Sequence, residues 1–269
     1  MANGWSPDGL ILDLDGTVYT GYRPIEGAAE AIAWLRSRGK RIVFLSNRGN
    51  ISRAMCRDRL EAIGVSCGAD EIILTSSVVS RYLAEHEPDA RVWVLGEQGL
   101  RDELALHGLR FAARPQEATR LVVTLHETLT YAELNDAFRA VRAGARIIAT
   151  NDDRTFPGED GEAIDVGALI AALTHATGVE ADTVVGKPSP IMAKAALDRL
   201  GLPPERCLVV GDSLRSDIAM GRRAGIRTAL VLTGSATREA AMALDPDERP
   251  DWILDSLADI RRLLEEMER

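Results

Sequence analysis

The sequence predicts an α/β fold with parallel strands, and three features of the 269-residue chain lead to this prediction. Short apolar runs alternate with longer amphipathic stretches almost throughout, which is the pattern of strands joined by crossover helices. Several runs are unbroken blocks of valine, isoleucine and leucine, as expected for strands that are buried on both faces. Hydrophobic residues make up 46% of the chain, so it can bury a sizeable core, in one large domain or in a core with a second module.

Ten apolar runs are the predicted strands, and in chain order they are Leu10–Leu14, Arg41–Leu45, Glu71–Leu74, Val92–Leu95, Leu121–Leu125, Arg146–Ala149, Thr183–Val185, Cys207–Val210, Thr228–Leu232 and Trp252–Leu254. Capping residues, glycines and prolines bound the predicted helices, of which the clearest are 28–38, 52–64, 130–141, 191–200 and 257–269. Thr130 followed by Glu133 has the spacing of a capping box. Pro188 and Pro190 stand where a helix opens, a position that tolerates proline.

Composition excludes several classes of function. The chain has 32 basic and 41 acidic residues, a formal net charge of -9, and an acidic protein repels the phosphate backbone of nucleic acids. No apolar run approaches the roughly 20 residues that a membrane helix needs, and the N-terminus lacks the features of a signal peptide. The three cysteines are odd in number and widely spaced, which favours reduced thiols. We therefore expect a cytoplasmic protein that binds neither nucleic acid nor membrane.

Four separated elements place polar residues directly after a predicted strand, where ligands bind in open parallel sheets. The first holds Asp13 and Asp15, two residues apart, followed by Gly16, which allows a sharp turn. Asp13 lies inside an apolar run, where a carboxylate without a partner is costly. The other three elements hold, in chain order, Ser46 with Asn47, then Lys187, then Asp212 with Asp217. Taken singly, the middle two are common at helix caps and strand ends, so the order of all four is the informative feature.

In this order, the four elements resemble the haloacid dehalogenase-like superfamily, and the resemblance covers essentially the whole chain. Six segments are also similar to its NagD-like and 4-nitrophenylphosphatase group, and these are 15–19, 24–28, 46–47, 129–131, 149–152 and 186–190. The resemblance implies a Rossmann-like, doubly wound parallel core over residues 1–81 and 183–269, with a smaller α/β cap inserted at residues 82–182. It is also compatible with a homodimer through the cap, which no motif in the sequence indicates.

The resemblance further implies a Mg²⁺-dependent phosphatase that hydrolyses small phosphorylated metabolites, such as sugar, nucleotide or glycolate phosphates. Asp13 would attack phosphorus and form a phospho-aspartyl intermediate, and Asp15 would act as general acid and then general base. The carboxylates of Asp13 and Asp212 and the backbone carbonyl of Asp15 would hold Mg²⁺. Asp217 would bind a metal-bound water or orient Lys187, which balances the crowded carboxylates. Asp15 also argues against dehalogenase chemistry, because family dehalogenases lack this second acid.

Substrate binding is expected from two groups of residues. The phosphoryl group would be held by Gly16, Ser46, Asn47 and Lys187. Arg48 stands where the group often has a second asparagine, and it is either a contact for an acidic substrate or a solvated side chain.

The leaving group would be recognised by a polar turn of the cap that contains Asn151, Asp152 and Phe156. Phe156 stands where pyridoxal phosphatases of this group carry a histidine. Two alternatives remain open at this point. One is a phosphotransferase or mutase with the same chemistry and another acceptor, and the other is a non-catalytic sensor of a phosphorylated ligand.

Overall fold

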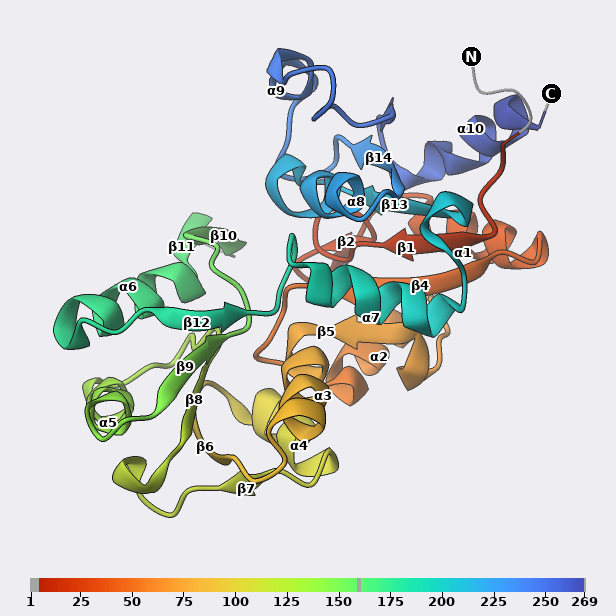
Figure 1. Cartoon of the computed structure of the whole chain (residues 1–269). Helices are drawn as coiled ribbons and strands as arrows, with labels where there is room; N and C mark the ends of the chain where they lie inside the picture. Colours follow the sequence, from red (N-terminus) through yellow and green to blue (C-terminus); the bar gives the residue numbers. More distant parts are fainter. Residues whose placement is uncertain (1–4, 159–160, 269) are drawn as a thin grey trace. The chain divides into compact units, whose positions relative to one another are not determined.

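The computed structural model describes residues 5–158 and 161–268, and they form two compact units (Figure 1). Unit 1 comprises Met1–Ser46, Arg57–Ile73 and Lys187–Arg269. Unit 2 comprises Asn47–Cys56 and Leu74–Gly186. The predicted boundaries at residues 82 and 182 both lie inside unit 2, and the functional division of the chain into core and cap stays a prediction.

Unit 1 is built on a six-stranded sheet. Its strands, in sheet order, are β15 (Trp252–Leu254), β14 (Arg227–Val231), β13 (Cys207–Gly211), β1 (Gly9–Leu12), β4 (Arg41–Ser46) and β5 (Ile72–Leu74). The pairings of β1 with β13 and β4, of β13 with β14, and of β14 with β15 are all parallel. Every residue of β1 and β13 is buried, which explains why these strands are unbroken apolar runs in the sequence.

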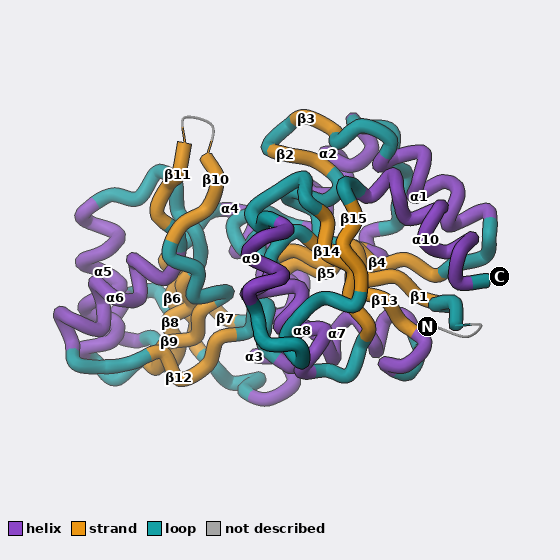
Figure 2. The backbone as a smooth tube through the Cα atoms, turned by 90° about the horizontal axis from the view of Figure 1, so that it is seen from above, coloured by secondary structure: helices purple, strands orange, loops and turns teal. Residues whose placement is uncertain are grey.

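Helices cover both faces of this sheet. Figure 2 shows α1 (Ala28–Ser37) and α10 (Ile260–Met267) on one side and α7 (Pro190–Leu200) and α8 (Ala219–Arg223) on the other, so the sheet is doubly wound. Helix α9 (Arg238–Ala243) also belongs to unit 1, and α2 (Arg53–Ala62) begins in unit 2 and ends in unit 1. A short antiparallel hairpin of β2 (Tyr19–Thr20) and β3 (Arg23–Pro24) follows the turn after β1.

Unit 2 has a parallel sheet of its own, packed between helices. Its strands, in sheet order, are β12 (Ala181–Val184), β9 (Arg146–Ala149), β8 (Arg120–Val123), β6 (Arg91–Leu95) and β7 (Arg110–Phe111). In Figure 2, α5 (Tyr131–Arg142) and α6 (Val166–Thr177) lie on one side of it and α3 (Thr75–His86) and α4 (Gln98–Leu106) on the other. Unit 2 also contains the antiparallel hairpin of β10 (Thr155–Gly158) and β11 (Gly161–Ile164).

The structure confirms the predicted α/β class and the parallel strands. Each of the ten predicted strands corresponds to a strand, and each of the five helices named from the sequence corresponds to a helix. The predicted terminal helix divides into a 3₁₀ turn over Leu257–Asp259 and α10, and its last residue, 269, lies outside the described residues. Strands β2, β3, β7, β10 and β11 were not predicted, because they are short and lack an apolar run.

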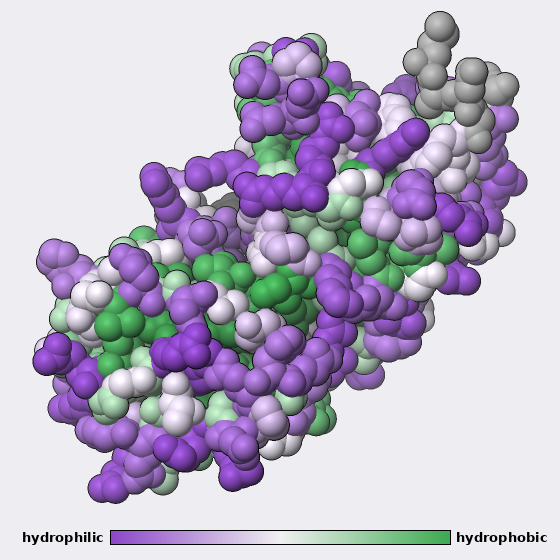
Figure 3. All heavy atoms as spheres, in the orientation of Figure 1, coloured by the Kyte–Doolittle hydropathy of each residue, from purple (hydrophilic) through white to green (hydrophobic). Residues whose placement is uncertain are grey.

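Hydrophilic side chains cover most of the face of the molecule in Figure 3, as the charged composition leads one to expect. On this face, hydrophobic residues gather over α6 and β12. The longest helices of residues 5–158 and 161–268 have 12 residues, well short of the roughly 20 that a bilayer requires. Nowhere in these residues is a helix both long and apolar enough to cross a membrane.

Candidate active site

The candidate site lies at the carboxyl ends of the central strands of unit 1. Asp13 directly follows β1, Ser46 is the last residue of β4, and Asp212 directly follows β13. Because β1 pairs in parallel with both neighbours, these three residues come to the same edge of the sheet. This is the edge at which open α/β sheets bind ligands.

Lys187 forms the centre of this site. Its Nζ lies 2.5 Å from Asp13 Oδ1 and 2.7 Å from Asp217 Oδ1, and it also donates to the backbone carbonyl of Leu45 at 3.4 Å. The Lys187 side chain is only 3% exposed, and both carboxylates are buried with it. Burying an ammonium with two carboxylates carries a large desolvation cost, and such charged clusters are typical of functional sites.

Asp212 completes a cluster that has the composition of a metal site. One carboxylate oxygen from each of Asp13, Asp212 and Asp217 lies within 4.8 Å of the others, and all three residues are buried. Three carboxylates and the Lys187 ammonium sum to a charge of about -2, which a divalent cation would neutralise. The ligands are oxygens only, as Mg²⁺ prefers. The donor set therefore fits the predicted ion.

The electrostatics of the cluster also favour a cation. Burial raises the pKa of Asp13 well above its usual value; Lys187 opposes this shift, while Asp217 and Asp212 add to it. Burial, together with the charge of Asp217, likewise raises the pKa of Asp212, against hydrogen bonds from Ser235. Burial lowers the pKa of Lys187, but the charges of Asp13 and Asp217 outweigh this and raise it overall. Lys187 is thus held as an ammonium, and a cation would help to keep the carboxylates ionised.

The structure adds Thr233, Gly234 and Ser235, which were not predicted, to the site. The Ser235 N–H donates to Asp212 Oδ2 at 2.6 Å, and Thr233 Oγ1 donates to the Gly16 carbonyl at 2.6 Å. A Cβ at Gly234 would lie 2.1 Å from Asp212 Oδ2, so only glycine fits there. The signal was present in the sequence, because this segment follows the predicted strand Thr228–Leu232 just as Asp212 follows its own strand.

Gly16 and Gly211 keep the carboxylates close to the backbone. Gly16 has φ +84°, and a Cβ on it would lie 2.7 Å from the carboxylate of Asp212. A Cβ on Gly211 would lie 2.2 Å from the carboxylate carbon of Asp217. Gly16 was predicted for its turn, and both the turn and the close approach require glycine.

Asp15 lies in the turn after β1, half-buried, and forms an isolated bridge with Tyr19. The structure thus brings together Asp13, Lys187, Asp212 and Asp217 by direct contact or close approach, with Asp15 two residues from Asp13 along the chain. Ser46, which is buried, neighbours Leu45, whose carbonyl accepts a hydrogen bond from Lys187.

The residues predicted to bind the leaving group all belong to unit 2, as do Asn47 and Arg48. The amides of Asn47 and Asn151 both donate to Asp153 Oδ2 at 3.0 Å. Asp152 is exposed, and Phe156 is partly buried against the core of unit 2. Whether any of these residues touches a substrate stays a prediction.

The positions of these residues agree with what the chain is similar to. Family models of haloacid dehalogenase-like and HAD-hydrolase-like proteins match residues 10–110 and 184–260. The sugar-phosphatase AraL of Bacillus subtilis is 53% identical over 261 residues, covering 97% of this chain and 94% of the relative. The structure of a p-nitrophenyl phosphatase from Archaeoglobus fulgidus superposes with a TM-score of 0.90 at 39% identity, covering 96% of this chain and all of that one.

A third relative was crystallised with a metal ion. This glycerol phosphate phosphatase from Mycobacterium tuberculosis, solved in complex with magnesium, has a TM-score of 0.85 at 33% identity and covers 93% of this chain, which spans 75% of that one. The matching family models, the extent of the identity and the acid-rich site at the sheet edge agree with one another. The chain belongs to the haloacid dehalogenase-like hydrolases, of the NagD-like group, and is a phosphoric monoester hydrolase.

Proposed function

We propose that the protein is a Mg²⁺-dependent phosphatase of small phosphomonoesters that works through a phospho-aspartyl intermediate on Asp13. One observation carries this proposal: the Lys187 ammonium contacts the carboxylates of Asp13 and Asp217, and the carboxylate of Asp212 completes a buried cluster that fits a divalent cation. Asp13, Asp212 and the backbone carbonyl of Asp15 would hold Mg²⁺, with Asp217 beside them. When bound, the ion neutralises charge and so lets an anionic nucleophile meet an anionic phosphate.

The residues of the chain then have distinct roles. Asp13 attacks phosphorus while the bond from phosphorus to the leaving oxygen breaks, and Asp15 protonates that oxygen. Asp15 next takes a proton from the water that hydrolyses the acyl phosphate, which releases inorganic phosphate and regenerates Asp13. Lys187 fixes the Asp13 carboxylate by its hydrogen bond at 2.5 Å. Ser46, Gly16 and the backbone N–H of Asn47 would orient the phosphoryl oxygens.

Sugar phosphates are the first substrates to test, because the chain is 53% identical to a sugar phosphatase. The loops of unit 1 supply groups for phosphate and metal, so we assign the choice of leaving group to the cap, above all to Asp152 and Phe156. Arg48 adds a positive charge that would favour an acidic leaving group. Phe156 has no hydrogen-bond donor in its side chain, so pyridoxal phosphate should be a poor substrate.

Phosphate release from a panel of sugar, nucleotide, glycolate and aryl phosphates tests this function. We expect release with Mg²⁺, none after removal of the metal with excess EDTA, and recovery when Mg²⁺ is restored. Full activity in excess EDTA would contradict the metal requirement. Phosphate transfer to an added sugar without release would favour the phosphotransferase, and binding without any turnover would favour a sensor.

Two further parts of the proposal concern the state of the protein in the cell. The odd number and wide spacing of the cysteines suit a reducing compartment such as the cytosol. A homodimer through the cap is also proposed, on the family resemblance. Light scattering of the purified protein at several concentrations measures its mass, and a monomer at every concentration would contradict the dimer.

A further inference from the structure

Two of the places where the chain passes from one unit to the other adjoin catalytic residues. Ser46 ends one stretch of unit 1 and is followed by Asn47 of unit 2, while Gly186 of unit 2 is followed by Lys187 of unit 1. We call 45–49 and 184–187 the crossing segments. Inside unit 1, Lys187 Nζ lies 3.4 Å from the Leu45 carbonyl. Inside unit 2, a Cβ on Gly186 would lie 2.8 Å from Asn47 Oδ1. The crossing segments therefore run side by side within each unit.

A polar cluster of unit 2 binds the first of these segments and packs against Gly186 of the second. We call its four residues, the buried Asn151 and Asp165 and the half-buried Asn47 and Asp153, the crossing clasp. Asp153 Oδ2 accepts hydrogen bonds from the amides of Asn47 and Asn151, both at 3.0 Å. The Asn151 amide also donates to Asp165 Oδ2 at 3.1 Å. Asp165 in turn caps α6, because its Oδ1 accepts from the Val166 N–H at 2.7 Å. The clasp thus joins the segment after Ser46 to the loop after β9 and to α6.

The side chain of Asn151 is fully committed to this cluster. It is 2% exposed, its Nδ2 donates to both Asp153 and Asp165, and its Oδ1 accepts from Thr150 Oγ1 at 3.1 Å. An asparagine amide nitrogen has two hydrogens to donate, and both are used inside unit 2. Asn151 is therefore placed to hold the protein rather than a substrate.

Close backbone packing fixes the same segments. A Cβ on Gly186 would lie 2.4 Å from the Thr150 carbonyl oxygen, and one on Gly49 would lie 2.2 Å from Thr124 Oγ1. Thr75 Oγ1 donates to the Asn47 carbonyl at 2.8 Å. Glycine is needed at both positions because the neighbouring groups are buried and cannot move away without breaking these contacts.

We propose that the crossing clasp is a positioning device for catalysis: Asn47, Asn151, Asp153 and Asp165 keep the crossing segments in register and thereby set the positions of Ser46 and Lys187. This inference rests on the proposed roles of Ser46 and Lys187. Its residues act through these two neighbours, so disrupting the clasp lowers kcat for every substrate in the same proportion. A residue that touched the leaving group would instead change the ranking of substrates.

Asn151→Asp tests the clasp with a side chain of nearly the same shape. The new carboxylate faces Asp153 and Asp165 in place of the amide, with Arg48 the positive charge nearby. We expect kcat at pH 7.5 to fall about 10- to 100-fold on a sugar phosphate and on p-nitrophenyl phosphate alike, with KM little changed. The ratio of variant to wild-type kcat should rise as the pH falls to 5.5, because a protonated carboxyl again donates a hydrogen bond.

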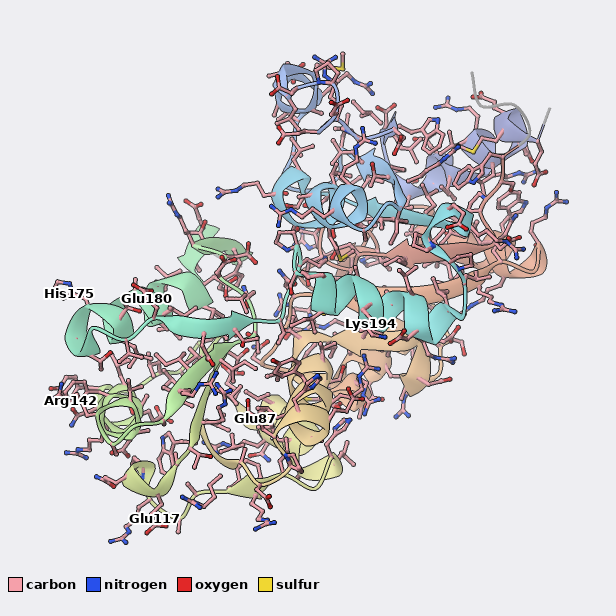
Figure 4. All side chains as sticks on the ribbon, viewed as in Figure 1. Glu87, Glu117, Arg142, His175, Glu180 and Lys194 are labelled. Carbon is pink, nitrogen blue, oxygen red and sulfur yellow. The ribbon has the colours of Figure 1, made fainter. Side chains whose placement is uncertain are left out.

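Two further variants act as rescue and control. Asn151→Asp/Asp165→Asn reverses donor and acceptor, so it should recover part of the loss at pH 7.5. Asp182→Asn is the control, because Asp182 binds Arg120 and Arg146 in unit 2 without any contact to the clasp. In that network Arg120 also binds Glu87, which is labelled in Figure 4 near the end of α3. Asp182→Asn should lower the melting temperature and leave kcat unchanged.

Several outcomes decide the question. The proposal is wrong if Asn151→Asp lowers kcat for one substrate only, or if the ratio of variant to wild-type kcat does not change with pH. It is also wrong if the double variant has no higher kcat than Asn151→Asp. If Asn151→Asp does not fold, Gly186→Ala poses the same question without a new charge, and equal kcat for this variant and the wild type overturns the proposal. A wild-type protein that releases no phosphate from any substrate refutes the proposed function instead.

Discussion

The neighbours of Asp13 create an environment that suits its proposed role as nucleophile. Its carboxylate is buried at the end of a strand whose four residues are all buried, and Lys187 and Thr17 both contact it, at 2.5 Å and 3.4 Å. Such an environment fixes the direction of the carboxylate and excludes water from it. Both features suit the proposed nucleophile, which needs no general base as long as the Lys187 ammonium and a bound cation keep it ionised against the burial that raises its pKa.

Asp13→Asn tests this role. The amide has nearly the same shape, so the fold should persist, but it is a poor nucleophile and a weak metal ligand. We expect kcat to fall below about a hundredth of the wild-type value, with an unchanged circular dichroism spectrum. A variant that kept a tenth or more of the activity would remove Asp13 from the mechanism.

The raised pKa of Asp165 leads to a prediction of how the stability of the protein changes with pH. Burial raises its pKa to about 6, and the charge of Asp153 adds to the shift, while hydrogen bonds from Val166 and Asn151 oppose it. A raised pKa means that the folded protein binds this proton more tightly than the unfolded chain. The contribution of Asp165 to stability is therefore present below about pH 4 and is lost as the pH rises through about 6.

Asp165→Asn removes this titration. Between pH 4 and pH 7 the free energy of unfolding of the wild type, relative to that of the variant, should fall by about 2–3 kcal/mol, since two pK units correspond to about 2.7 kcal/mol. Urea unfolding at several pH values measures the difference. Parallel curves for the two proteins would show that Asp165 keeps an ordinary pKa.

The single residues of the site were predictable to different extents. Asp13 stood out because a carboxylate interrupts an apolar strand, and Asp212 and Asp217 because they follow another strand. The commitment of Asn151 to Asp153 and Asp165 was not predictable, since its partners lie 2 and 14 residues away and meet it only through the path of the loop. Tertiary contacts of this kind leave no periodic trace in a sequence.

Helix α5 shows how local chemistry sets an element. Thr130 Oγ1 accepts from the Glu133 N–H at 3.3 Å, and the Glu133 carboxylate accepts from the Thr130 N–H at 2.8 Å, so the capping box predicted from the sequence is formed. Thr130→Ala should lower the free energy of unfolding by about 1 kcal/mol and leave phosphatase activity unchanged. Thermal or urea denaturation measures the first effect and phosphate release the second. A loss of activity would place α5 in the catalytic machinery.

Strands buried on both faces were predictable because each is a continuous apolar run. The missed strands have a different origin. Both residues of β7 are exposed, and so is most of β11, so their pairing follows from where tertiary packing brings two backbones together. Such elements carry no hydrophobic pattern that would identify them.

At the scale of the whole molecule, neighbouring residues belong to different units. Ser46 and Asn47 are adjacent in the chain, as are Gly186 and Lys187, yet the unit boundary passes between the members of each pair. The boundaries predicted from the sequence, at residues 82 and 182, lie well inside the interval between Asn47 and Lys187, because motif spacing indicates that an insertion is present but not where its ends pack. We therefore expect that substitutions at Asp152 and Phe156, which lie outside the crossing clasp, change the choice of substrate without changing the chemistry of unit 1.

Phe156→His and Asp152→Ala test that separation. Histidine restores a hydrogen-bond donor at position 156, and a hydrogen bond to a charged group contributes about 1.5–3 kcal/mol, so kcat/KM for pyridoxal phosphate should rise about tenfold relative to p-nitrophenyl phosphate.

Asp152→Ala should change the ranking of sugar phosphates while leaving the aryl phosphate nearly unaffected, because a small aryl group has few polar atoms to recognise. Asn151→Asp, by contrast, should slow all substrates in proportion. If the variants at 152 and 156 also scaled every substrate equally, or if phosphoproteins were hydrolysed best, selectivity would reside outside this turn.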